Sequence, residues 1–303
     1  MKGKKVIVTG GAGFIGSHIV DACIERGADV NVIDDLYGGK RENVNKRAKF
    51  HELDICDIES IKPIFDSVSY VFHEAALPRV QFSIENPALT HDVNVDGMRN
   101  VLICAHEAGA KRVVYAASSS AYGDQEKLPL TEDMEAQPKS PYGLQKYMGE
   151  LMCKLWSDVY GLQTVSLRYF NVYGTRHDPD GPYALVIGKF LKQLNEGKAM
   201  TITGDGEQTR DFTHISDVVR ANLLAAESNN VGKGEVMNIG SGNETSVNEL
   251  SSLIGGPTEY IEARLEPKRT RADITLAMEL LGWEPLFSFE EGIEELKKEY
   301  GLK

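Results

Sequence analysis

The chain has 303 residues, of which 42% are hydrophobic and 26% charged, as in an ordinary globular protein with one large domain or two. Its net charge of -12 argues against a nucleic-acid partner, because binding to a phosphate backbone requires a basic face. No apolar run approaches the ~20 residues that span a bilayer, and too few residues precede the first glycine run to form a signal peptide. We therefore expect a cytoplasmic protein with no membrane partner. Four widely spaced cysteines predict neither a disulfide framework nor a metal site.

The first predicted elements are a strand, a glycine turn and a helix. An apolar run at residues 5–9 opens directly into the turn, and a helical pattern follows at residues 17–26. This order is the context of a dinucleotide-binding site, in which one glycine allows the tight turn, the next the approach of a pyrophosphate and the last the packing of helix on strand. We therefore assign to a dinucleotide cofactor the residues Gly10, Gly13, Phe14, Ile15 and Gly16.

A second apolar run, at residues 29–33, ends in two aspartates, Asp34 and Asp35. A carboxylate at this point accepts hydrogen bonds from the ribose hydroxyls of an adenosine and repels a 2′-phosphate. The position therefore favours NAD over NADP, with Asp34 as the candidate for the ribose contact. A turn or helix-capping aspartate is the alternative.

Strands and helices continue to alternate through the first half of the chain. Residues 70–76 are predicted as a buried strand that ends in Ala75 and Ala76, small residues suited to a chain that passes the pyrophosphate. A helix is predicted from residue 86 to residue 108, and a further strand at residues 113–117. This alternation implies a parallel sheet with helices on both faces.

Three serines, Ser118, Ser119 and Ser120, follow the strand at residues 113–117 directly. Ligands of open parallel sheets bind beyond the carboxyl ends of the strands. We therefore expect these hydroxyls in the ligand-binding crevice.

A helix is predicted to begin at Ser140 and Pro141, which suit the N-cap and the first helical position. Tyr142 and Lys146 then share one face of that helix, because they are four residues apart. An ammonium within ~4–6 Å lowers the pKa of a tyrosine and makes it a general base near neutral pH. A solvated helix face is the alternative.

The glycine spacing, Ser118 and the Tyr142/Lys146 pair together resemble the extended short-chain dehydrogenase/reductase superfamily, and within it the NAD-dependent UDP-glucose and UDP-N-acetylglucosamine 4-epimerase family. The resemblance implies a Rossmann-type doubly wound parallel sheet and a smaller, mixed α/β, C-terminal substrate-binding domain. Residues 1–175, with about 213–240, would bind NAD, and residues 176–212 and 241–303 the UDP-sugar. The turn-rich residues 178–183 would form the boundary. Helix faces at 88–108 and 142–160 would form the seam of a homodimer, and the alternative is that either face belongs to the core.

The resemblance also implies roles for individual residues. Ser118, Tyr142 and Lys146 would be catalytic, and Tyr142 and Lys146 would also contact the cofactor. Further cofactor contacts would come from Asp54, Ile55, Asn94 and Tyr169. The substrate would be bound by Arg79, Ser118, Ser119, Ser120, Tyr142, Asn171, Arg210, Arg264, Arg269 and Thr270. Thr270 stands where related 4-epimerases have a gatekeeper beside the sugar, and a small residue there admits an acetamido group.

The residues that follow the strand at 113–117 also distinguish between the reactions that members of the superfamily catalyse. Family members that dehydrate a sugar nucleotide carry an Asp-Glu pair where this chain has Ser119 and Ser120. Without a carboxylate to protonate the leaving hydroxide, the resemblance favours epimerisation at carbon 4 over elimination. Two alternatives remain: a UDP-glucuronate 4-epimerase or decarboxylase, and a non-catalytic NAD-sensing binding protein. The intact Ser118, Tyr142 and Lys146 argue against the second.

Overall fold

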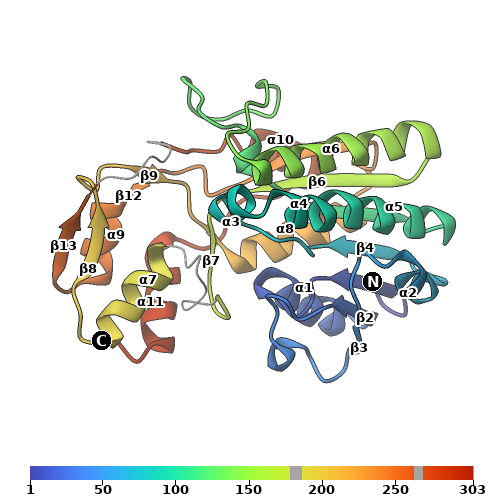
Figure 1. Cartoon of the computed structure of the whole chain (residues 1–303), viewed down its shortest axis with the longest axis horizontal. Coiled ribbons are helices and arrows are strands. Elements are labelled where there is room, and N and C mark those ends of the chain that lie inside the picture. Colours follow the sequence, from blue (N-terminus) through green and yellow to red (C-terminus); the bar gives the residue numbers. More distant parts are fainter. Residues whose placement is uncertain (178–185, 263–268, 303) are drawn as a thin grey trace.

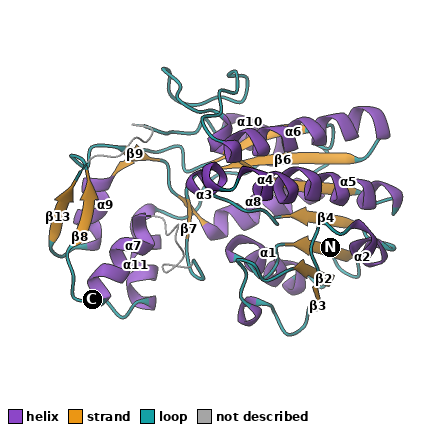
Figure 2. Ribbon diagram, in the orientation of Figure 1, coloured by secondary structure: helices purple, strands orange, loops and turns teal. Residues whose placement is uncertain are grey.

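A sheet of seven strands forms the centre of the molecule, as the ribbon diagrams show (Figures 1 and 2). The computed structural model describes residues 1–177, 186–262 and 269–302, so the predicted boundary turn at 178–183 lies outside the described residues. The strands of the sheet are β1 (Lys5–Thr9), β2 (Asp29–Asp34), β3 (Lys49–Glu52), β4 (Tyr70–His73), β5 (Arg112–Ser118), β6 (Gln163–Tyr169) and β11 (Glu235–Ile239). The predicted strand at 70–76 is therefore shorter and ends at His73.

All neighbouring strands of the sheet run parallel, in the order β11-β6-β5-β4-β1-β2-β3. The order reverses between β1 and β4, because β2 and β3 lie on one side of β1 and the later strands on the other. In an open α/β sheet the crevice at this reversal, beyond the carboxyl ends of the strands, is where ligands bind. The carboxyl ends of β1, β4 and β5 carry Gly10, Glu74 and Ser118 to this place.

Helices cover both faces of the sheet, so the predicted doubly wound architecture is confirmed (Figure 1). Alternate residues of β1 serve the two cores, since Val6 and Val8 pack on one face and Ile7 on the other. The first core includes residues of α1 (Phe14–Glu25), α8 (Ile215–Glu227) and α10 (Thr275–Leu281). The second core includes residues of α2 (Ile58–Ile61), α5 (Met98–Glu107) and α6 (Pro141–Tyr160).

The helix predicted at 86–108 is interrupted. It consists of α4 (Pro87–His91), a π-helical segment at Asp92–Gly97 and then α5, and α3 (Val80–Glu85) precedes it. A π-helical turn inside a helix often marks a functional site. Here it contains the predicted cofactor residue Asn94.

A second cluster of elements stands at the left of the sheet in Figure 1. Its core is built around apolar residues such as Phe190, Met200 and Leu250. Short strand pairs accompany it, β8 with β13 in parallel and β9 with β12 antiparallel, and β7 pairs with β10. These elements are β7 (Val172–Tyr173), α7 (Val186–Asn195), β8 (Met200–Thr203), β9 (Thr209–Arg210), β10 (Thr213–His214), β12 (Thr245–Ser246), α9 (Val247–Ile254), β13 (Thr258–Ile261) and α11 (Phe289–Glu299).

Within residues 1–177, 186–262 and 269–302, no helix is long and apolar enough to cross a membrane. In the same described part, no group of three or more His, Cys, Asp or Glu side chains could hold a metal ion.

Candidate active site

The turn between β1 and α1 needs its glycines for two different reasons. Gly10 has a φ of +69°, and a Cβ on it would lie 2.6 Å from the amide nitrogen of Ala75. A Cβ on Gly16 would collide with the carbonyl oxygen of Gly10. Gly13 precedes α1 with no side-chain cap, so Phe14 and Ile15 begin the helix at an N-terminus suited to a phosphate group. This cradle of backbone fits the pyrophosphate of a dinucleotide.

Asp34 lies beside the glycine turn and is tied to it. Its Oδ2 accepts a hydrogen bond from the amide of Ala12 at 2.9 Å, and its Oδ1 accepts one from the amide of Leu36 at 2.8 Å. Burial raises the pKa of the carboxyl group, and the two amide bonds oppose that rise. Asp35 accepts from the amide of Tyr37 at 3.0 Å instead. The contact of Asp34 with a ribose stays a prediction.

The amide of Asn94 joins three elements. Its Oδ1 accepts from the backbone of Leu77 at 2.7 Å, and its Nδ2 donates to the Leu77 carbonyl at 3.1 Å and to Gln145 Oε1 at 2.9 Å. Asn94 therefore holds the loop that contains Ala75 and Ala76 against α6. Its predicted contact with the cofactor remains a prediction.

Asp54 and Ile55 follow β3 at the edge of the cofactor side. The Oδ1 of Asp54 accepts from the amide of Cys56 at 2.8 Å. Ile55 is buried, and a Cβ on Gly97 of the π-helical segment would lie 2.6 Å from its Cδ1. The structure therefore fixes this turn against the helix, and the contact of Asp54 and Ile55 with the cofactor stays a prediction.

The three predicted catalytic residues come together at the carboxyl end of β5. Ser118 is the last residue of β5, and its hydroxyl group is hydrogen-bonded with the phenol of Tyr142. Ser140 caps α6 by accepting from the amide of Gly143 at 3.1 Å, as predicted, which places Tyr142 in the first turn. Lys146 follows on the same helix, and its Nζ lies 6.0 Å from the centre of the Tyr142 ring.

The predicted lowering of the Tyr142 pKa by Lys146 is not found in the structure. Burial raises the pKa of Tyr142, the hydrogen bond with Ser118 lowers it, and the charge of Glu74 raises it. The Lys146 Nζ donates to the Ala116 carbonyl at 2.7 Å rather than to the phenol. Burial also lowers the pKa of Lys146 to about 8. The spacing along the helix predicts that the two groups are close, but burial removes both from water, and this desolvation outweighs the effect of the ammonium on the phenol.

Glu74 was overlooked as a site residue in the sequence, where it formed part of the predicted strand at 70–76. Its Oε1 accepts a hydrogen bond from the Tyr169 hydroxyl at 3.0 Å, at the end of β6. Burial raises the pKa of Glu74 to about 7, and the Tyr169 bond and the charge of Lys146 oppose the rise. A carboxylate directly after a buried strand was the signal that could have found it.

On the other side of the crevice, Asp211 gathers several predicted substrate residues. Asn171, with a strained φ of +26°, donates from its Nδ2 to the Asp211 carbonyl at 2.8 Å. The Asp211 amide donates to Thr270 Oγ1 at 3.3 Å. The buried Asp211 carboxylate accepts from the amides of Ser241 at 2.6 Å and Ala272 at 2.9 Å. Arg210 directly precedes Asp211 in the chain, so it lies near Asn171 and Thr270, which both bond to the Asp211 backbone.

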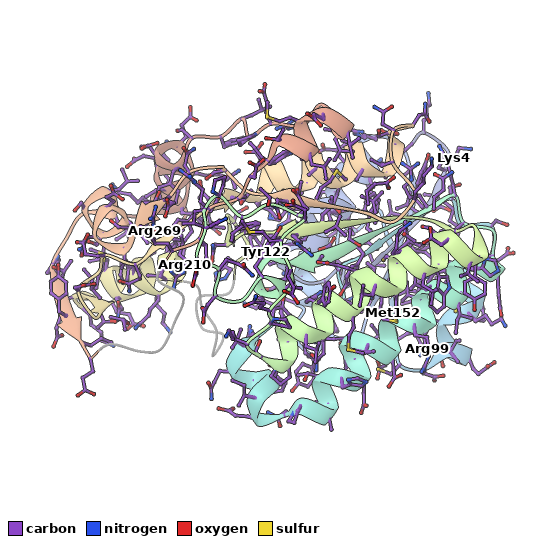
Figure 3. All side chains as sticks on the ribbon, turned by 90° about the horizontal axis from the view of Figure 1, so that it is seen from above. Lys4, Arg99, Tyr122, Met152, Arg210 and Arg269 are labelled. Carbon is purple, nitrogen blue, oxygen red and sulfur yellow. The ribbon has the colours of Figure 1, made fainter. Side chains whose placement is uncertain are left out.

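The remaining predicted substrate residues are spread more widely. Arg269 is 60% exposed at its side chain and forms a two-pronged ion pair with Glu244, at 2.8 and 2.6 Å. Glu244 also accepts from Thr209, so Arg269 and Arg210 lie on the same side of the molecule (Figure 3). Ser120 donates its amide to the Ser118 hydroxyl at 3.2 Å in the turn that Ser119 begins, and Arg79 precedes α3. Arg264 lies outside the described residues.

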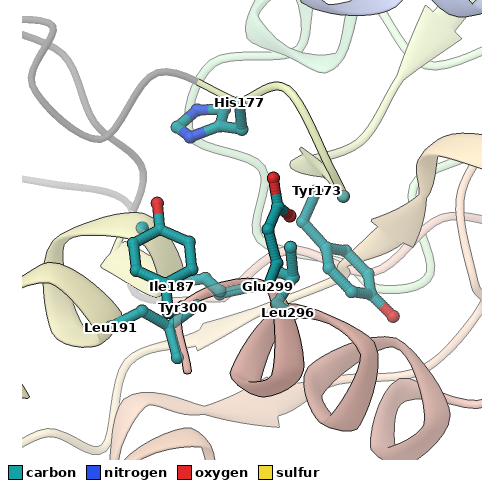
Figure 4. A pocket seen from close by; sticks show the side chains of 9 residues that line it. Tyr173, His177, Ile187, Leu191, Leu296, Glu299 and Tyr300 are labelled. Atoms are coloured by element: carbon teal, nitrogen blue, oxygen red, sulfur yellow. The ribbon is translucent and has the colours of Figure 1, made fainter. Parts of the chain in front are cut away.

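A pocket between α7 and α11 contains none of the predicted site residues (Figure 4). Its lining is mostly apolar and consists of Tyr173, Gly174, His177, Ile187, Gly188, Leu191, Leu296, Glu299 and Tyr300.

Comparison with known proteins gives the family. Residues 6–240 match the model of the NAD dependent epimerase/dehydratase family. The chain belongs to this epimerase/dehydratase family. The predicted resemblance and the predicted NAD cofactor are thereby confirmed. The curated UDP-glucose 4-epimerase of Mycolicibacterium smegmatis is a relative, 36% identical over 95% of this chain and 96% of that protein.

Two solved structures of epimerases have the same fold. The UDP-N-acetylglucosamine 4-epimerase of Methanobrevibacter ruminantium M1, in complex with UDP-N-acetylmuramic acid, is 37% identical, with a TM-score of 0.94 and 98% of each chain covered. The UDP-glucose 4-epimerase of Thermotoga maritima, with UDP-glucose, is 41% identical, with a TM-score of 0.92 and 98% of each chain covered.

Relatives that are named as UDP-uronate enzymes are nearly as similar to this chain as the UDP-glucose 4-epimerases are. A UDP-glucuronate 4-epimerase of Thermodesulfobacterium geofontis is 37% identical over 95% of this chain and 93% of that protein. A UDP-N-acetyl-alpha-D-glucosaminuronate decarboxylase of Bacillus cytotoxicus is 33% identical over 96% of each. The family relationship therefore leaves the sugar open.

Proposed function

We propose that this epimerase/dehydratase family member is a UDP-hexose 4-epimerase. It interconverts UDP-glucose with UDP-galactose, and UDP-N-acetylglucosamine with UDP-N-acetylgalactosamine, through a 4-keto sugar. Residues 1–175 and about 213–240 bind NAD, residues 176–212 and 241–303 bind the UDP-sugar, and the protein works in the cytoplasm. The observation that carries the proposal is the meeting of Ser118, Tyr142 and Lys146 beyond β5, on the same edge of the parallel sheet as the glycine turn.

Tyr142 is the proton shuttle of the proposed reaction. It takes the proton from the hydroxyl at carbon 4 of the sugar and later returns it. Ser118 bonds to the reacting oxygen and to the phenol, so it orients one toward the other. Lys146, whose pKa is lowered to about 8 by burial, would hold the nicotinamide ribose and supply positive charge to the buried site. NAD, when bound in the glycine turn, would supply a reversible acceptor for the hydride of carbon 4.

The UDP part of the substrate is held while the sugar turns over. Arg210 binds the diphosphate, since a guanidinium donates paired bonds to phosphate oxygens. Asn171 lies beside it because both are fixed on Asp211. Fixing the diphosphate and leaving the sugar to rotate would let either face of carbon 4 turn to the hydride-transferring cofactor, while the oxygen on carbon 4 stays within reach of Tyr142.

Ser119 and Ser120 support epimerisation over dehydration, because no carboxylate follows β5 at these positions. The carboxylate that the structure does bring near, Glu74, is bonded to Tyr169 at the end of β6. A uronate-specific enzyme is the rival, and it needs a cation beside the sugar carboxylate.

Thr270 tests the choice of sugar. Wild-type protein is expected to act on UDP-galactose and on UDP-N-acetylgalactosamine. In Thr270→Tyr, kcat/KM for the acetamido sugar alone is expected to fall about 10- to 100-fold, because the tyrosine ring fills the space that the acetamido group needs. Thr270→Ser keeps a hydroxyl for the Asp211 amide and serves as the control. A coupled assay of each sugar gives the answer. Turnover of UDP-glucuronate in place of both hexoses would establish the rival.

We also propose a homodimer. The outer face of α6 exposes Leu151 (52%), Leu155 (50%) and Val159 (62%), and their spacing makes one apolar stripe. α3, which contacts the start of α6 through Ser83 and Tyr142, exposes Ile84 (52%) as well. Contiguous apolar patches of this kind mark interaction sites, and two copies of one stripe can pair about a two-fold axis.

Glutamate at both Leu151 and Leu155 is therefore expected to convert a dimer into a monomer in light scattering after gel filtration. Leu286→Glu is the control, because Leu286 is 63% exposed and its amide bonds to Asp217 of α8, a helix on the opposite face of the sheet from α6. A wild-type protein that elutes as a monomer at assay concentration would exclude the dimer.

A further inference from the structure

Glu74 places a carboxylate in the middle of the candidate active site. It directly follows β4, and its amide donates to the Thr9 carbonyl at 3.1 Å, which continues the line of the strand. Its side chain meets the Tyr169 hydroxyl at the end of β6. Because β5 lies between β4 and β6, the Glu74 side chain reaches across the carboxyl end of β5, the strand whose Ala116 carbonyl holds Lys146.

The direction of the bond between Glu74 and Tyr169 is set by Asn222. The Nδ2 of Asn222 can only donate, and it lies 2.8 Å from the Tyr169 oxygen. The phenol proton is therefore directed to Glu74. Since a phenol is a neutral donor, this bond orients the Glu74 carboxylate but does not neutralise its negative charge.

Four ionisable side chains face Glu74 from three elements. They are Lys146 and Tyr142 of α6, Tyr115 of β5 and Tyr169 of β6. Burial raises the pKa of all three tyrosines, so they are neutral. His73 stacks on Tyr115 and is neutral too, because burial lowers its pKa to about 3. Among these groups of the described chain, Lys146 is the cation that Glu74 meets.

Lys146 also faces a second carboxylate, Glu150, on the same helix. Both oxygens of Glu150 accept from Arg168, at 2.8 and 2.7 Å. The guanidinium therefore already matches the charge of Glu150. Glu74 is the carboxylate whose charge is left for Lys146.

We propose that Glu74 is a positioning residue of this site: its carboxylate balances the Lys146 ammonium and so keeps the Tyr142 and Lys146 pair in the charge state that proton transfer requires. The link to proton transfer rests on the proposed function, whereas the charge balance does not. Burial raises the pKa of Glu74 to about 7 and lowers that of Lys146 to about 8, and their attraction opposes both shifts.

Two substitutions separate the charge of Glu74 from its hydrogen bond. Glu74→Gln keeps an oxygen for the Tyr169 hydroxyl and removes the charge, whereas Glu74→Asp keeps the charge and shortens the reach to Tyr169. The control is Glu132→Gln, an equivalent change at a partly buried glutamate that accepts from the Asn238 amide and does not act on Lys146.

The measurement is the titration of Lys146 in the NAD-loaded protein, by NMR of lysines labelled with carbon-13 and assigned with Lys146→Met. In Glu74→Gln, Lys146 is expected to titrate roughly 1 pH unit lower than in wild type, because the charge of Glu74, which raises the pKa of Lys146, is lost. In Glu74→Asp and Glu132→Gln it should titrate near the wild-type pH. An unchanged titration in Glu74→Gln overturns the proposal, whether or not any UDP-sugar is converted.

Two further measurements distinguish a failure of the proposed role of Glu74 from a failure of the proposed function. The alkaline limb of kcat/KM should move to lower pH in Glu74→Gln together with Lys146, and an unmoved limb overturns the link to proton transfer. In the wild type, the carboxyl signal of Glu74 should inflect where Lys146 titrates, and a missing inflection overturns the charge balance even if no variant folds. A wild type that converts no UDP-sugar refutes the proposed function, and the titration alone then decides on Glu74.

Discussion

Replacing Tyr142 by phenylalanine is expected to lower kcat by about 10²- to 10⁴-fold, the range that a positioned general acid-base group contributes. The ring stays in the first turn of α6, so packing is kept and only the hydroxyl that bonds with Ser118 is lost. Bound NAD should remain at the wild-type stoichiometry, because the glycine turn is untouched. Steady-state assays and the NAD content of the purified variant are the measurements.

Tyr147→Phe is the matched control for this variant. Tyr147 lies on the same helix one residue beyond Lys146, and the same hydroxyl is removed. It is expected to keep nearly the wild-type kcat. If Tyr142→Phe kept it as well, Tyr142 could not be the proton shuttle, and the assignment of the site would be wrong.

Arg168→Met is expected to destabilise the fold by about 3–5 kcal/mol at neutral pH, because it leaves the Glu150 carboxylate buried without its partner. Both side chains of this pair are nearly inaccessible, at 4% and 2%. The pair joins α6 to β6, and Glu150 is one turn beyond Lys146, so the same contact fixes the catalytic helix on the sheet. Urea unfolding measures the loss.

The loss in Arg168→Met should shrink in mild acid. Burial raises the pKa of Glu150, and Arg168 opposes that rise, so its removal raises the pKa further. A carboxyl group with a raised pKa in the folded state costs stability as pH rises, because the fold then buries a charge that the unfolded chain exposes to water. Lower pH protonates Glu150 and relieves the cost.

The exposed pair of Lys154 and Asp158 on the same helix provides the contrast, since both side chains are 53% exposed. Asp158→Asn should change the free energy of unfolding by no more than about 0.3–0.5 kcal/mol. If Asp158→Asn and Arg168→Met lowered the free energy of unfolding by the same amount, burial could not be the reason why the Glu150–Arg168 pair stabilises the fold.

Elements defined by local chemistry could be predicted closely from the sequence. Ser140 and Pro141 mark the start of α6 because capping depends on the residues next to one another. The glycine turn was identified for the same reason, since Gly10 requires a positive φ and Gly16 a missing Cβ. Ser118 was placed correctly because a residue after a parallel strand must emerge at the carboxyl edge.

Contacts between distant residues could not be predicted in this way. Glu74 and Tyr169 are 95 positions apart, and Asn94 and Gln145 are 51 apart, so no local pattern joins either pair. The π-helical segment around Asn94 was missed because it is invisible to a helical period. The pKa of Tyr142 was predicted with the wrong sign because desolvation is a property of the assembled core.

The most direct test of the account is to incubate the purified protein with UDP-galactose, without added nicotinamide nucleotide, and to follow both sugars by chromatography. A 4-epimerase with bound NAD is expected to form UDP-glucose until an equilibrium is reached that is the same from either sugar, with no net NADH, because the cofactor is restored in every cycle. The protein would not be a UDP-hexose 4-epimerase if, NAD-loaded and folded, it converted neither UDP-galactose nor UDP-N-acetylgalactosamine but epimerised or decarboxylated UDP-glucuronate.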